Sequence, residues 1–270
     1  MKARTESLHH DTRSAIFLCA SLSDQRERRR NFARNFDNES EYQFVDSVDG
    51  RGWNEEYADT FVSEELKKIR ANHLAAGRTW VAAPAVACAL THRDLMLPVA
   101  IEHDAIICED DAAIDRAFIK LWQNQQVREV FRKFPGPILI HYKANKPITV
   151  DTKPAAQIEG FSIHRLASDH IMSTACYYVN ASTAQSIIAA QTPIHRSADQ
   201  WRGIQRDAGF EDIFVIHPSP CRISEFASTI GYNSGAVSSS NSTVIRQLRR
   251  IHRRLRARQK QIYDRVDNLP

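Results

Sequence analysis

The chain has 270 residues, of which 43% are hydrophobic and 25% charged, so it is long and apolar enough to bury the core of one large domain. No apolar run approaches the about 20 residues that a membrane-spanning helix needs, and no charged-then-apolar leader opens the chain, so we expect a cytoplasmic protein. The five cysteines are scattered without zinc-site spacing, which predicts buried free thiols.

The predicted elements alternate between strands and helices after a frayed start at residues 1–13. Strands are predicted at 15–20, 42–45, 105–108, 137–142, 173–179 and 213–216, and helices at 25–36, 55–73, 85–103, 114–134, 181–190 and 198–208. We expect Pro98 to kink or split its helix, and 143–167 to be a loop. The order predicts an α/β domain over 14–234 with a mixed, mostly parallel sheet covered on both faces, which binds ligands beyond the carboxyl ends of its strands.

The basic charge of the chain is concentrated near its end. Segment 244–266 holds nine Lys or Arg against the single acid Asp264, so the net charge of +4 leaves the remainder of the chain negative. Apolar residues at helical spacing in this segment predict a basic amphipathic helix over 244–270, tethered by a serine-rich linker at 235–243. We expect this tail to dock the protein peripherally on the anionic inner leaflet.

The tail has two alternative interpretations, of which only the first remains open. It can pack on its own protein or on a second subunit of an oligomer, through its apolar stripe. Arginine clusters also bind phosphate backbones, but we do not expect nucleic acid as the partner, because the body is acidic and contains no recognised nucleic-acid module.

Three consecutive acids, Glu109, Asp110 and Asp111, end the predicted strand at 105–108. Strand alternation puts Glu109 and Asp111 on one side. Their mutual repulsion would be relieved by a hard dication, and oxygen ligands suit Mg²⁺ or Mn²⁺ bridged to substrate phosphates. The alternative is that they are acids favoured by the dipole of a helix that follows.

Several segments, in order, are similar to one protein family. They are FLCASLSDQRERR, which covers the first strand and the segment after it, ACALTH in the third predicted helix, the strand end ICEDDA, the strand YYVN with its following helix, the turn Ser197-Ala198-Asp199 and the late HPSPC. Together they resemble the glycosyltransferases of lipopolysaccharide biosynthesis known as family 25, over about residues 14–232. Val86-Ala87 stands where the family usually has Gly-Glu, and Thr91 where it has Ser.

The resemblance implies a GT-A-like fold and a metal-assisted, inverting transfer of a hexose. The donor it implies is a UDP-sugar, often UDP-galactose, the metal Mn²⁺ or Mg²⁺, and the acceptor a sugar on lipooligosaccharide. We assign Glu109, Asp111 and His217 to the metal, and Glu109 and Asp110 to the donor nucleotide. Arg26 and Arg28 are also assigned to the nucleotide, because they lie just past the first strand, where its diphosphate would sit; the alternative is a solvated basic helix face.

Asp199 is the candidate base, because inversion by direct displacement requires a group that removes the acceptor hydroxyl proton. The alternative is an ordinary helix N-cap at Ser197 or Asp199. His92 lies on an apolar helical face, as a packing histidine or an acceptor ligand, and His217 completes the metal shell or meets a phosphate.

Two other functions stay open. A different carboxylate-metal enzyme, such as a phosphoryl or nucleotidyl transferase, would transfer phosphate instead of releasing UDP from a UDP-sugar. A non-catalytic protein on the same fold would bind membrane or nucleic acid without turnover.

Overall fold

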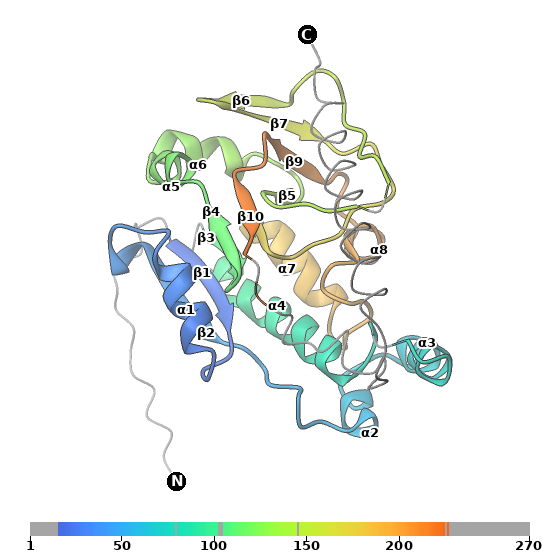
Figure 1. The fold of residues 1–270 in the computed structure, drawn as a ribbon. Helices are drawn as coiled ribbons and strands as arrows, with labels where there is room; N and C mark the ends of the chain where they lie inside the picture. The colour runs from blue at the N-terminus through green and yellow to red at the C-terminus, as the bar shows by residue number, and fades with distance from the viewer. Residues whose placement is uncertain (1–15, 79, 102–104, 145, 225, 227–270) are drawn as a thin grey trace, which may run out of the picture.

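A computed structural model describes residues 16–78, 80–101, 105–144, 146–224 and 226. Its centre is an eight-stranded sheet in the order β2-β1-β3-β8-β5-β9-β7-β6 (Figure 1). The strands are β1 Ile16–Ser21, β2 Tyr42–Asp46, β3 Ala105–Glu109, β5 Ile138–Leu139, β6 Ala156–Ile158, β7 Phe161–Arg165, β8 Cys176–Tyr178 and β9 Phe214–His217. A separate pair joins β4 Ala112–Ile114 to β10 Cys221–Ile223.

The sheet is mixed, as predicted, but the expectation that it is mostly parallel is wrong for the described strands. Of its seven strand pairings three are parallel and four antiparallel. The pairings leave β1, β2, β3, β5, β6 and β9 running in one direction, with β7 and β8 opposed. The carboxyl ends of those six strands therefore lie at one edge, together with the starts of β7 and β8, and we call it the carboxyl edge.

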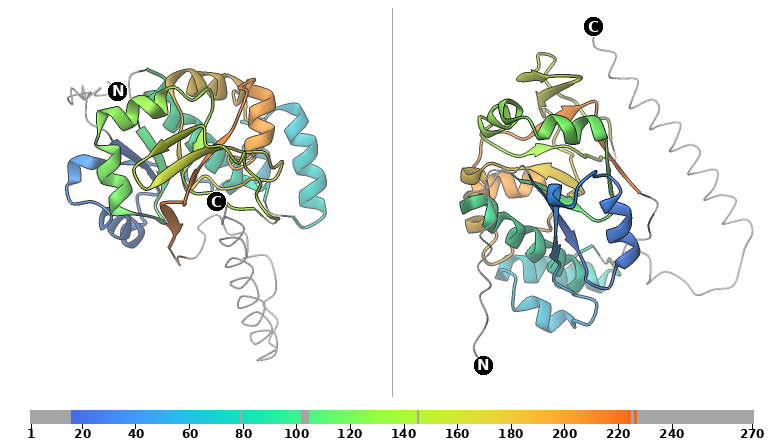
Figure 2. Two further views of the ribbon diagram at one scale, coloured as in Figure 1. Left: turned by 90° about the horizontal axis from the view of Figure 1, so that it is seen from above. Right: turned by 90° about the vertical axis from the view of Figure 1, so that its left-hand side faces the viewer.

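Helices cover both faces of the sheet, as the alternating order predicts (Figures 1 and 2). One face packs on α1 Arg26–Ala33, α5 Arg116–Trp122 and α6 Gln125–Arg132, and the other on α4 Ala83–Ile101, α7 Ala181–Ala190 and α8 Trp201–Ala208. Strand β1 shows the period of two that this sandwich requires, because Phe17 and Cys19 enter the first core and Leu18 and Ala20 the second. The cysteines are free, and all but Cys88 are fully buried.

Tertiary contacts divide the helix predicted at 55–73 into α2 Glu55–Asp59 and α3 Glu64–Ala75. The residues between the two helices pair with Ile194, whose N–H donates to the Phe61 carbonyl while the Ser63 N–H donates to the Ile194 carbonyl. Ser63 then caps α3 by accepting from the Leu66 N–H. The short helix η1, Glu39–Glu41, precedes β2.

Three further expectations are corrected. The segment 143–167 contains β6 and β7 and is not a loop throughout. Helix α4 continues through Pro98 to Ile101 without a split, and Pro98 lies in its last turn. The helix predicted at 114–134 is two helices, capped by Asp115 and Asn124.

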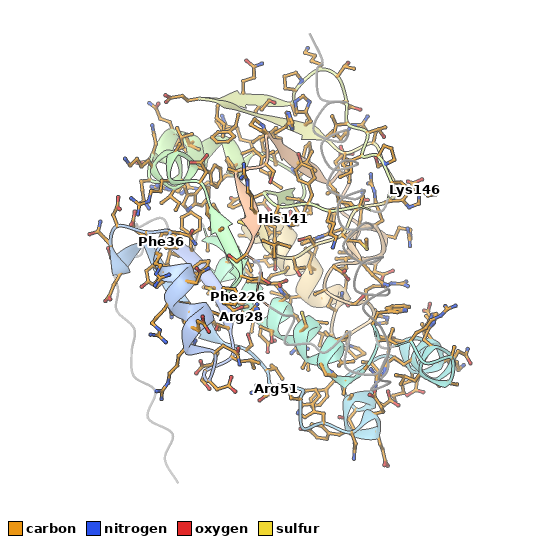
Figure 3. The ribbon with its side chains drawn as sticks, in the orientation of Figure 1. Arg28, Phe36, Arg51, His141, Lys146 and Phe226 are labelled. Atoms are coloured by element: carbon orange, nitrogen blue, oxygen red, sulfur yellow. The ribbon has the colours of Figure 1, made fainter. Side chains whose placement is uncertain are left out.

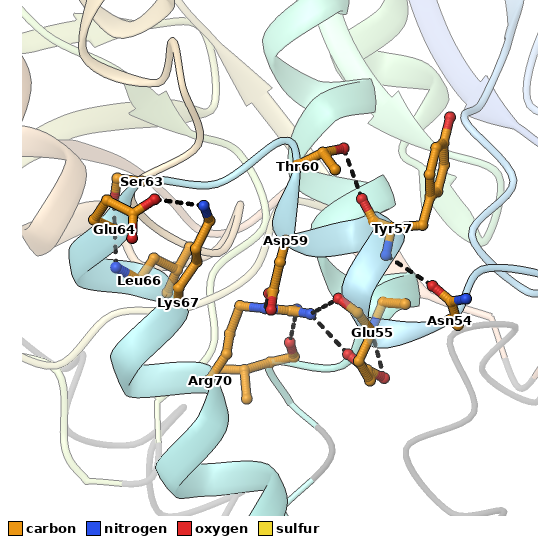
Figure 4. Close-up of polar contacts among 12 residues, drawn as sticks. Asn54, Glu55, Tyr57, Asp59, Thr60, Ser63, Glu64, Leu66, Lys67 and Arg70 are labelled. Carbon is orange, nitrogen blue, oxygen red and sulfur yellow. Dashed lines mark hydrogen bonds and ion pairs between the residues drawn. The ribbon is translucent and has the colours of Figure 1, made fainter.

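A buried arginine attaches α2 and α3 to the start of α4 (Figure 4). Arg70 is 1% exposed and donates to the carboxylates of Asp59 and Glu55, at 2.7 Å each, and to the Val81 carbonyl. The other carboxylate oxygen of Glu55 accepts from the Ala83 N–H, the first residue of α4. The ion pairs thus connect three helices through a guanidinium that has five donors in a fixed fork.

Gly136 makes a close backbone contact just before β5. A Cβ added there would lie 1.9 Å from the Asp212 carbonyl oxygen, so Gly136→Ala is expected to lower the free energy of unfolding by about 1–3 kcal/mol. Gly52→Ala is the matched control, because nothing lies within 4 Å of its added Cβ and its stability should change by about 0.5 kcal/mol or less. Urea unfolding measures the stability of both variants. Equal stability would show that the backbone around residues 136 and 212 moves apart without a cost in free energy.

The remaining expectations fall on parts of the chain that the structure leaves undescribed. The frayed start at 1–13, the linker at 235–243 and the basic tail at 244–270 all lie outside the described residues. Within the described ranges, none of the helices is long and apolar enough to pass through a bilayer.

Candidate functional site

The acids at the end of β3 lie at the carboxyl edge of the sheet. Ser21 and Asp46 end the neighbouring strands β1 and β2. Strand β3 itself ends at Glu109, and the chain turns through Asp110 and Asp111 before β4 begins. Because the strand stops at Glu109, the alternation rule does not extend over the three acids, and each has its own surroundings.

Asp110 is a buried carboxylate with both oxygens occupied by protein donors. Arg28, on α1, donates from Nε and pairs through Nη2 with Oδ1, each at 2.6 Å, and the Ser21 hydroxyl donates to Oδ2 at 2.7 Å. Asp110 is 6% and Arg28 7% exposed. The Arg28 guanidinium also lies 5.4 Å from the centre of the Phe226 ring (Figure 3). Two residues assigned to the donor nucleotide are therefore bound to each other.

Arg26, the other arginine assigned to the nucleotide, lies apart from these acids. It is exposed in the first turn of α1, and within the described part of the chain no ion pair joins it to a carboxylate. Arg29, its neighbour on α1, pairs with Asp46 at the end of β2 and donates to the Ser21 carbonyl at 2.9 Å.

Asp111 has one oxygen that no described residue satisfies. Its Oδ2 lies 3.1 Å from Arg28 Nη2, whereas Oδ1 is buried and has no hydrogen-bond partner among the described residues. Burial, and next the negative charge of Glu109, raise the pKa of Asp111 to about 6. A buried carboxylate oxygen without a donor is costly, so Oδ1 of Asp111 is open to a hydrogen-bond donor or a cation.

Glu109 interacts with a residue of α4, the helix that covers the face of the sheet opposite to α1. Its Oε1 accepts from the Thr174 hydroxyl and lies 3.5 Å from Nε2 of His92, on α4. Although burial acts to raise it, the pKa of Glu109 is lowered, because His92 and Thr174 stabilise the carboxylate. His92 is buried and shares a 3.0 Å hydrogen bond between Nδ1 and the Tyr177 hydroxyl. It therefore packs within the protein and orients Glu109.

Asp199 lies on the turn before α8, near Glu109 and His92. Burial raises the pKa of Asp199; the Glu109 charge adds to the rise, and His92 opposes it. The N-cap of α8 is Gln200, with no side-chain cap bond, so Asp199 and Ser197 do not serve as the N-cap that the sequence left open. Trp201 anchors this turn to the carboxyl edge, because its indole N–H donates to the Ser173 carbonyl at 2.8 Å.

Comparison with known proteins assigns the chain to a family. A profile of glycosyltransferase family 25, the lipopolysaccharide biosynthesis proteins, matches residues 15–201. The chain belongs to glycosyltransferase family 25. Among curated proteins none matches it. Family 25 membership makes the chain a glycosyltransferase, with a sugar donor and a glycan acceptor, and the matched region includes His92, the three acids at the end of β3 and Asp199.

His217 lies beyond the region that the family 25 profile matches. It ends β9 at the carboxyl edge, and its Nδ1 lies 3.4 Å from the Tyr142 hydroxyl. No three His, Cys, Asp or Glu side chains of the described ranges gather closely enough to hold a metal, so Glu109, Asp111 and His217 do not form a ready three-ligand set. The protein groups that fit a dication are Asp111, through its unsatisfied oxygen, and the neighbouring Glu109.

Several residues of this family 25 site were absent from the sequence prediction. Ser21, Thr174 and Tyr177 each hold one of the predicted residues in place. Ser21 carried a usable signal, because it follows the first predicted strand directly, where parallel strands present their ligands. Thr174 lies two residues before β8, which is antiparallel to β3, and only the pairing of these two strands brings it to Glu109.

Proposed function

We propose that this family 25 protein transfers a hexose, with galactose the first candidate, from a UDP-sugar to a sugar of a lipopolysaccharide or lipooligosaccharide acceptor. The reaction inverts the anomeric carbon, on a GT-A-like fold. The observation that carries the proposal is that a half-buried aspartate, Asp199, lies near enough to the acidic end of β3, at the carboxyl edge, for the charge of Glu109 to raise its pKa. Such edges are where open α/β sheets bind their ligands.

Asp199 is proposed as the general base. It removes the proton of the acceptor hydroxyl while that oxygen bonds to the anomeric carbon and the bond from this carbon to the UDP oxygen breaks. Burial raises the pKa of Asp199 toward the working pH, and this strengthens it as a base. Its place on a turn anchored by Trp201 fixes it relative to Glu109.

Asp111 and Glu109 are proposed to hold Mn²⁺ or Mg²⁺. The buried, unsatisfied Oδ1 of Asp111 fits a hard cation, and such ions are often bound by one or two carboxylates together with substrate phosphates and water. A bound dication would act as a Lewis acid on the departing diphosphate. Arg28 and Asp110 are proposed to stabilise the conformation of the acidic turn, because the Arg28 guanidinium forms a hydrogen-bonded ion pair with the Asp110 carboxylate.

We also propose that the basic segment 244–266 brings the enzyme to the cytoplasmic face of the inner membrane. The support is its composition, nine Lys or Arg against Asp264, together with a lipid-linked acceptor. Each cation near anionic headgroups contributes about 1 kcal/mol of attraction.

Thermal unfolding with UDP, UDP-galactose and UDP-glucose, in Mn²⁺ or in EDTA, tests the donor site. A ligand at about 100 times its Kd should stabilise the wild-type protein by about 2.7 kcal/mol in Mn²⁺ and not in EDTA. Asp111→Asn should lose this stabilisation, because it removes the anionic ligand of the metal. Asp37→Asn, the same change at an exposed carboxylate, should keep it.

Three outcomes would contradict the proposal. Stabilisation by anionic lipid vesicles but by no nucleotide would favour a non-catalytic protein. Release of phosphate, in place of UDP, from the same substrates would favour a phosphoryl transferase. Full stabilisation of Asp111→Asn by UDP-galactose in Mn²⁺ would remove Asp111 from the donor site.

A further inference from the structure

Ser173 has an unusual backbone conformation beside the proposed site. It precedes β8 with φ of 100°, and within the described ranges it is the one residue other than glycine with positive φ. Side chains clash with the backbone in this region, so a residue held there is strained and persists only where its surroundings fix it. Glycine would adopt the same φ without that cost, so the serine side chain is expected to contribute something that glycine lacks.

Ser173 joins three segments of the carboxyl edge. Its hydroxyl shares a 2.7 Å hydrogen bond with Nδ1 of His141, just beyond β5, and accepts from the Ala175 N–H at 3.2 Å. Its carbonyl accepts from the Trp201 indole at 2.8 Å. The next residue, Thr174, donates its hydroxyl to Glu109.

These bonds connect the two carboxylates of the proposed reaction. Trp201 follows Asp199 by two residues, and its ring packs against Tyr177 with centroids 4.9 Å apart. Tyr177 in turn bonds His92, which faces Glu109. A loosening at Ser173 therefore reaches Asp199 through Trp201, and Glu109 through Thr174.

We propose that Ser173 is a positioning residue, whose strained backbone and hydroxyl fix Asp199 relative to Glu109. This inference rests on the proposed function, in which these two carboxylates serve the acceptor and the metal. Misplacing a catalytic group by about 1 Å can cost about 100-fold in rate. The strained backbone at Ser173 thus lowers the stability of the fold but fixes the position of Asp199 relative to Glu109, as strain does at other functional sites.

Ser173→Gly separates the effect of Ser173 on stability from its effect on the geometry of the site. The substitution relieves the backbone strain, but it also removes the hydrogen bonds of the hydroxyl and leaves the backbone freer to move. We expect kcat for UDP release from UDP-galactose with acceptor to fall about tenfold or more, with KM for the donor changed less than about threefold. We expect the Tm to stay the same or rise. A kcat within about twofold of wild type, or a kcat that falls only together with the Tm, would overturn the inference.

A matched pair at His141 provides a second measurement. In His141→Asn the side-chain amide can replace Nδ1 as the partner of Ser173, so kcat should stay within about threefold of wild type, whereas His141→Ala should fall like Ser173→Gly. Equal rates in the two variants would count against the inference. The failure of the proposed function is distinguishable, because it would show in the wild-type protein as the absence of UDP release.

Discussion

Asp199→Asn is expected to lower kcat about 100- to 10,000-fold, while KM for the UDP-sugar changes little. The amide keeps the size of the side chain but cannot take the proton of the acceptor hydroxyl, and general bases contribute about this much to rate. Release of UDP from UDP-galactose, measured with and without acceptor, checks the prediction. Asp169→Asn makes the same change of charge at an exposed carboxylate and should leave kcat unchanged.

The same base predicts the acid limb of the pH profile. As the proposed base, Asp199 must be deprotonated to act, so kcat/KM should fall as the pH drops through its pKa. Burial raises that pKa above the ordinary value of 3.8, so the loss of activity should begin at a higher pH than for an exposed aspartate. At saturating Mn²⁺, which would keep the proposed metal ligand Asp111 deprotonated, the residual activity of Asp199→Asn should lack this limb. If Asp199→Asn keeps both the wild-type rate and the acid limb of the pH profile, another residue is the base.

The position of the acidic turn was predictable from the sequence, whereas the roles of its acids were not. A short apolar run followed by three acids identifies a buried strand and its carboxyl end, because burial and length are local properties. Asp110 is neutralised by Arg28, which lies 82 residues away in the chain, and Glu109 is held by Thr174, 65 residues away. Such partners follow from strand order and helix packing, which local patterns do not encode.

The antiparallel end of the sheet was missed for a related reason. Strands β6 and β7 form an edge hairpin in which only Ile163 and His164 are fully buried, so neither shows the apolar run of a central strand. Gly160, with φ of 73° at the turn of this hairpin, was the available signal. Without these strands an alternating order of elements favours a parallel sheet, and that expectation was wrong.

Arg28→Met is expected to lower the free energy of unfolding by about 3–5 kcal/mol. The methionine can fill the volume of the arginine stem. Among the described residues, however, Asp110 would remain buried with one hydrogen bond, from Ser21, and no countercharge at contact distance. Breaking a buried ion pair by removing one partner costs about this much, because the other charge stays out of water. Equilibrium urea unfolding at pH 7 measures the change, with an unaltered m-value showing that the unfolded state is the same.

Arg26→Met is the control for Arg28→Met, since it removes the same charge from an exposed position on the same helix and should change stability by about 0.5 kcal/mol or less. Adding Asp110→Asn to Arg28→Met should restore part of the lost stability, because the buried charge is removed as well; residues in one network couple by about 0.5–3 kcal/mol. If Arg28→Met is as stable as Arg26→Met, Asp110 is already solvated or neutral in the folded protein. Arg28 would then be available to the donor diphosphate, as the sequence first suggested.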